Sequence, residues 1–169
     1  MRSTVQPLLF VAFLLACTGG LRGAPLQSGD SAPPQSERVR IGVSHFDRAF
    51  YDLTPHKRDA EAAREFDLAA AEFERELAAN PASVVAHRYL ARIQAARKNH
   101  LESARHYDRV SELLPLDLDA CVFAAQAYVD AGRIEEARAR LTAAQARTSD
   151  SVALARLAQY LDRLDAFPR

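Results

Sequence analysis

The sequence predicts an all-α fold, a short α-solenoid of helix–turn–helix units with a capping helix at each end. One observation is local: small and apolar residues recur at helical spacing on both sides of Gly132, between Ala120 and Ala144. This pattern is typical of two amphipathic helices facing each other across a tight turn, and Gly132 suits the left-handed conformation at which helices often end. The second observation is that the pattern returns upstream at a constant offset.

The offset aligns residues of similar size in three successive stretches of the chain. One aligned position is always small, as in Ala69, Ser103 and Ala137. Another is always large and apolar, as in Phe73, Tyr107 and Leu141, and a proline closes each of the first two units, Pro81 and Pro115. A period of about 34 residues with this pattern resembles the tetratricopeptide repeat. The resemblance covers about residues 66–149. It implies a stack of helix pairs that serves as a non-catalytic protein-binding scaffold.

Two helices are expected before the complete units. Ser44 is a suitable N-cap for a short helix that ends at Thr54-Pro55, because the residue before a proline avoids the helical conformation. No helix breaker follows from Pro55 to Ala79. We therefore expect one long helix there, in preference to a helix pair with a turn near Arg64-Glu65.

The repeat domain as a whole is expected at residues 44–165. The turn of its second unit is Arg97-Lys98-Asn99, in which Asn99 is available for a left-handed conformation. Terminal repeats must cover an end of the stack, so the last amphipathic helix is interpreted as a C-terminal cap. The expected units are 50–83, 84–117 and 118–151, followed by the capping helix 151–165.

The N-terminal residues 1–16 are interpreted as an export signal peptide. Arg2 gives a positive start, and the apolar run Pro7–Ala16 is too short to span a bilayer. The run ends in Leu14-Leu15-Ala16-Cys17, which resembles the lipobox of bacterial lipoproteins. The resemblance implies that Cys17 is lipidated and that the protein is anchored in the cell envelope, with the outer membrane facing the periplasm as the expected site. The alternative is an ordinary cleaved signal peptide with an incidental cysteine.

Residues 17–43 are expected to form a flexible linker between this lipid anchor and the repeat domain. The stretch is rich in glycine, proline, serine and glutamine, and it shows no hydrophobic periodicity. Such a composition buries too little apolar surface to offset the entropy of the chain.

Charge and motif content argue against most other functions. The chain has 22 Lys+Arg and 22 Asp+Glu residues, and this zero net charge disfavours nucleic-acid binding. Its five histidines show no metal-ligand spacing, so no metal site is expected. No phosphate-binding loop and no nucleophile with a partner base are present. We therefore expect no catalytic residue, no cofactor and no small-molecule substrate.

The resemblance places partner binding on the first helix of each unit. Arg88 and Arg92 lie one helical turn apart, so their guanidinium groups are placed to receive a carboxylate together, with both side chains expected to be exposed. We expect a protein or peptide partner of unknown identity. The candidate partner-binding residues are Arg88, Tyr89, Arg92, Phe123, Gln126 and Asp130.

Two alternatives remain open at this point. The domain could be a structural envelope lipoprotein that self-associates without using a groove. It could also be a thiol-dependent redox partner that uses Cys121, which requires an exposed thiol. A buried free cysteine in that position would instead behave as a small hydrophobic residue.

Overall fold

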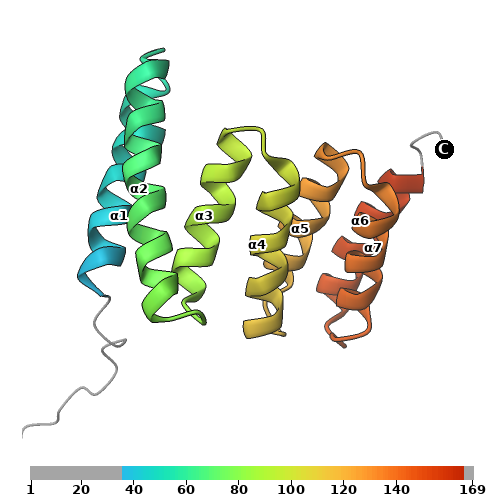
Figure 1. Ribbon diagram of the computed structural model, residues 1–169. Coiled ribbons are helices and arrows are strands. Elements are labelled where there is room, and N and C mark those ends of the chain that lie inside the picture. The colour runs from blue at the N-terminus through green and yellow to red at the C-terminus, as the bar shows by residue number, and fades with distance from the viewer. Residues whose placement is uncertain (1–35, 166–169) are drawn as a thin grey trace, which may run out of the picture. The chain divides into compact units, whose positions relative to one another are not determined.

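The computed structural model describes residues 36–165, and every regular element in this range is helical. Figure 1 shows successive helices lying side by side, and each packs against the next. The all-α solenoid is therefore confirmed. The elements are α1 (Glu37–Asp47), the π-helix η1 (Arg48–Leu53), α2 (Asp59–Ala79), α3 (Val84–Ala96), α4 (His100–Leu113), α5 (Leu118–Asp130), α6 (Ile134–Gln145) and α7 (Ser151–Asp165). None of the described helices is both long and apolar enough to cross a bilayer.

The repeat period is visible in the positions at which the helices begin. Helices α3 and α5 start at residues 84 and 118, and α4 and α6 start at residues 100 and 134. The N-caps follow the same period: the Ser83 hydroxyl accepts a hydrogen bond from the amide of Ala86, and the Asp117 carboxylate accepts one from the amide of Ala120. These caps satisfy backbone donors that the first helical turn leaves unpaired.

The turns inside the second and third units share one geometry. Gly132 is left-handed with φ of 74°, as predicted, but in the second unit Lys98 and not Asn99 takes this conformation, with φ of 61°. In both turns the left-handed residue donates its N–H to the carbonyl three residues earlier, to Ala95 at 2.9 Å and to Val129 at 2.8 Å. The prediction for Asn99 was wrong because the turn position is fixed by the repeat and not by the residue with the best left-handed preference.

The first helix begins earlier than predicted. Ser36, and not Ser44, caps α1 by accepting from the amide of Val39 at 3.2 Å, so residues 37–43 are helical and do not belong to the expected linker. Gly42 explains why this segment packs: a Cβ atom there would lie 2.9 Å from the ring of Phe73 on α2. A glycine is needed for so close an approach of two helices.

The connection between η1 and α2 also differs from the prediction. Residues 54–57 form a turn that ends with Lys57 at φ of 57°, so α2 begins at Asp59 and not at Pro55. From there α2 continues without a break through Arg64 and Glu65, in agreement with the expectation of one long helix.

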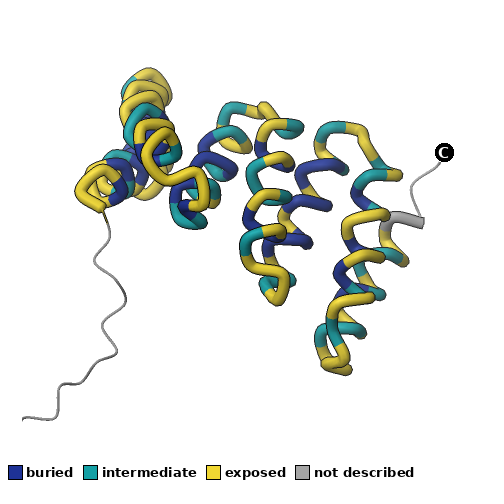
Figure 2. Tube along the Cα trace, turned by 60° about the horizontal axis from the view of Figure 1, so that its bottom comes forward, coloured by how far each residue is buried: buried dark blue, intermediate teal, exposed yellow. Residues whose placement is uncertain are grey.

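Two clusters of buried side chains hold the helices together, and Figure 2 shows buried residues on the faces by which neighbouring helices meet. The first cluster joins α1, η1, α2 and α3 around Phe46, Phe73 and Leu90. The second joins α4 to α7 around Leu141 and Leu157. The small residue of each unit is completely buried, which allows close helix contact; these residues are Ala69, Ser103 and Ala137.

Enlarging one of these small residues should destabilise the fold. Ala137 is 0% exposed, so Ala137→Leu overpacks the contact and should lower the free energy of unfolding by about 1–3 kcal/mol in urea denaturation. Ala139→Leu on the exposed face of the same helix is the matched control, with an expected change within about 0.5 kcal/mol. Equal effects of the two substitutions would contradict the proposed role of the small position.

Candidate functional site

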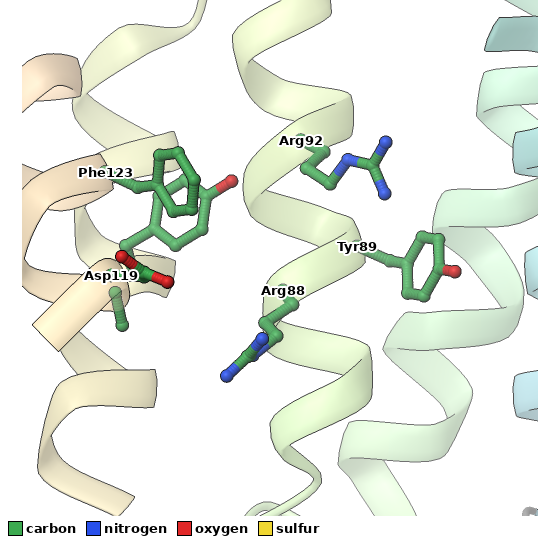
Figure 3. Close-up of a pocket in the computed structure, with 7 residues that line it drawn as sticks. Arg88, Tyr89, Arg92, Asp119 and Phe123 are labelled. Carbon is green, nitrogen blue, oxygen red and sulfur yellow. The ribbon is translucent and has the colours of Figure 1, made fainter. Parts of the chain in front are cut away.

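A groove lies between α3, α4 and α5, with a volume of about 510 Å³. Its lining comes from three helices, and Figure 3 labels lining side chains from two of them, α3 and α5. The lining residues are Arg88, Tyr89 and Arg92 from α3, Tyr107 from α4, and Asp119, Ala120 and Phe123 from α5. We call this the α3–α5 groove. Four of the six residues predicted for partner binding therefore come together in it.

One wall of the α3–α5 groove is aromatic. The rings of Tyr107 and Phe123 lie 5.3 Å apart between centroids, and Phe123 is 52% exposed. Burial raises the pKa of the Tyr107 phenol, while Arg92 and Arg88 act in the opposite direction. The phenol thus stays protonated near neutral pH and can donate a hydrogen bond. An exposed phenylalanine beside a half-buried tyrosine provides apolar contact area together with one polar atom.

Arg92 lies over the aromatic residues of the N-terminal helices. Its guanidinium carbon lies 4.4 Å from the centroid of Phe46 and 5.3 Å from that of Phe50, a geometry that gives a cation–π attraction. The side chain is half-buried, which corrects the expectation that it is exposed. Within the part of the chain that the structure describes, no carboxylate forms an ion pair with Arg92, and its guanidinium donates to the Tyr51 hydroxyl at 3.5 Å.

Arg88 is already paired with a carboxylate. Its guanidinium donates to Asp117, which also caps α5. Arg88 and Arg92 therefore do not form the two-arginine clamp expected from their spacing. Asp119, on the opposite side of the groove, pairs with Arg156 of α7 at 2.9 Å. Two of the charged side chains that line the groove are thus partly neutralised, and Arg92 carries the remaining positive charge.

Gln126 and Asp130 lie outside the α3–α5 groove. The Gln126 amide donates to Asp130 at 2.9 Å, and Asp130 lies 3.9 Å from His100. Gln126 contributes instead to a second cavity of about 220 Å³, which Val129 and Tyr160 also line. The sequence did not indicate Tyr107 as a groove residue, because it belongs to the second helix of its unit and partner binding is expected on the first helices.

Cys121 is buried, with 2% of its surface exposed. Its sulfur lies 3.3 Å from the Ser111 hydroxyl, and Arg147 donates to it at 2.7 Å. Burial of the thiol disfavours the redox alternative, which requires access to the sulfur. In the described residues no group of three or more His, Cys, Asp or Glu side chains is placed to hold a metal ion. Two histidines, His87 and His106, are nevertheless brought together from different helices.

Similarity to known proteins is confined to solved structures. No family model matches the chain, and no curated protein matches it. The chain is similar to the solved structure of a mutant of MamA, with 16% sequence identity and a TM-score of 0.42 over 77% of this chain and 92% of that one. The assignment of the fold rests on the chain's own helices and their period, which is the period of tetratricopeptide repeats.

Asp117 should contribute to stability mainly as a helix cap and less as the partner of Arg88. Asp117→Ala removes both interactions and should cost about 1–2 kcal/mol in urea denaturation. Asp117→Asn keeps an oxygen for the cap but removes the ion pair, and since Arg88 is 47% exposed it should cost at most about 1 kcal/mol. Equal losses in the two variants would show that the cap contributes nothing.

Proposed function

We propose that this protein is a non-catalytic interaction scaffold that binds a segment of a partner protein in the α3–α5 groove. The observation that carries the proposal is the combination of an exposed aromatic wall with an arginine that has no carboxylate partner among the described residues. Aromatic and arginine side chains are the types that most often dominate the binding energy of protein interfaces.

The groove favours a segment with two chemical features. An aromatic or branched apolar side chain would pack on Phe123 and Tyr107, whose rings form the apolar wall. A carboxylate of the partner would form an ion pair with Arg92, because this guanidinium packs on aromatic rings and is not paired with a described carboxylate side chain. Arg88 is less suited to this role, since binding a ligand there would compete with Asp117.

We also propose that the protein is exported and anchored in the cell envelope through a lipid on Cys17. The support is the sequence alone: Arg2, the apolar run Pro7–Ala16 and the cysteine that follows it. These residues lie outside the described range. Two or more acyl chains would give a stable anchor, whereas a single chain binds a membrane only marginally.

The groove proposal predicts which substitutions weaken binding. A peptide library displayed on phage and selected on the full chain should yield peptides that combine an apolar anchor with an acidic residue. Phe123→Ala should weaken the affinity of such a peptide at least tenfold in calorimetry. Arg92→Met should remove its salt dependence, because it replaces the guanidinium that lies over Phe46 with an uncharged side chain.

Arg105→Met is the matched control, because Arg105 is an exposed arginine paired with Glu102 away from the groove. It should leave the affinity unchanged. If peptides bind Phe123→Ala and Arg92→Met as tightly as the parent, the α3–α5 groove is not the binding site.

The anchor proposal predicts a change of cell fraction. Cys17→Ser removes the acylated thiol and should release the protein from the membrane fraction, whereas Cys121→Ser should leave it there because that thiol is buried in the repeat domain. Metabolic labelling with a tagged fatty acid should mark the parent and Cys121→Ser only. Membrane retention of Cys17→Ser with no label on the parent would refute the anchor.

A further inference from the structure

A histidine pair lies away from the groove. His87 of α3 and His106 of α4 point their Nδ1 atoms at each other across 3.1 Å, with ring centroids 5.4 Å apart. Neither residue lines the α3–α5 groove. The two positions lie on different helices and are not close in the chain, which is why the sequence did not indicate the pair.

The second nitrogen of His87 fixes the proton on that ring. His87 Nε2 lies 3.2 Å from the backbone carbonyl oxygen of Pro81. A carbonyl oxygen only accepts hydrogen bonds, so Nε2 must carry the hydrogen, and in the neutral ring Nδ1 is a bare lone pair. Histidines that bind metal ions are oriented in this way, with the other ring N–H donated to a backbone carbonyl or a carboxylate.

The spacing of the two Nδ1 atoms is suited to a shared ion. Bonds of about 2.0–2.1 Å to zinc place two nitrogens roughly 2.9–3.4 Å apart for bond angles between about 90° and 109°. The observed 3.1 Å falls inside this range. We propose that His87 and His106 bind a divalent transition-metal ion of the zinc, copper or nickel class through their Nδ1 atoms. Imidazole is a preferred ligand for these metals, and water would fill the remaining coordination positions.

The charge state of the pair agrees with this site. Without an ion, the Nδ1–H of His106 donates to the bare Nδ1 of His87, and metal binding selects the other neutral tautomer of His106, in which the proton is on Nε2. Burial is the main cause that lowers the pKa of both histidines, and the charge of His87 lowers the pKa of His106 further. Both rings are therefore neutral near neutral pH, as metal ligands must be.

The charged neighbours of the pair are of both signs. Arg109 and Glu112 act on His87, and they pair with each other at 2.7 Å. Glu102 acts on His106 and is itself paired with Arg105. Arg109, the cation that lowers the pKa of His87 among the described residues, is thus balanced by Glu112, and these charged pairs place no net positive charge against an approaching divalent ion.

The test is a titration of the full chain with Zn²⁺ followed by calorimetry at pH 7.5. We expect one ion per chain, binding at least tenfold weaker in His87→Gln and in His106→Gln, and loss of binding at pH 5 because both imidazoles must then give up protons. His100→Gln, which changes a half-buried histidine outside the pair, is the matched control and should bind as the parent does.

A measurement on the unmutated chain keeps the test independent of folding in the variants. Two-dimensional ¹H–¹⁵N spectra of the histidine rings should show Zn²⁺-dependent shifts of Nδ1 in His87 and His106 and none in His45, His56 or His100. No binding up to about 1 mM Zn²⁺, or shifts confined to the other three histidines, would overturn the proposal.

Discussion

The fold depends on close contact between neighbouring helices at one small residue per unit. Ala69, Ser103 and Ala137 are each 0% exposed and occupy the same position of three successive units. Because protein interiors are packed nearly as densely as crystals, such a position admits no larger side chain without moving a helix. The second unit keeps the required size even with a hydroxyl, and the Ser103 oxygen is buried with no hydrogen-bond partner among the described groups. Size therefore outweighs polarity at this contact.

The helices that local signals define were the ones predicted well from the sequence. The helices of the second and third units are separated by helix-breaking residues, and their positions agree with the repeat period. These residues are Pro81, Pro115 and Gly132. The start of α1 was missed because it depends on Gly42 fitting against Phe73, a contact between residues of different helices that are far apart in the chain. The turn of the second unit was also mispredicted. Lys98 lies one repeat before Gly132 and takes the same left-handed conformation, although the neighbouring Asn99 has the stronger intrinsic preference for it.

Only those residues of the candidate site that occupy equivalent positions of successive repeats could be predicted from the sequence. Arg88, Tyr89 and Phe123 were found because equivalent faces of adjacent first helices meet. The residues that contact the two arginines were not predicted. Arg88 pairs with Asp117 and Arg92 stacks on Phe46, and no local sequence pattern relates the members of either pair. Gln126 was misplaced for the converse reason: it lies only one turn beyond Phe123, yet it faces the cavity that α7 helps to line.

The period also places unlike chemistry at equivalent positions. His87 corresponds to Cys121 and His106 to Arg140, each one repeat further along the chain. In the second unit two imidazoles face each other, whereas in the third the thiol contacts Ser111 and Arg147, and Arg140 pairs with Asp108 at 2.7 Å. None of these four positions lines the α3–α5 groove, and none is the small contact residue. The small contact residues therefore hold neighbouring helices together. The positions of His87 and His106, and of Cys121 and Arg140 one repeat later, can differ in their polar side chains without changing either the helix contacts or the groove.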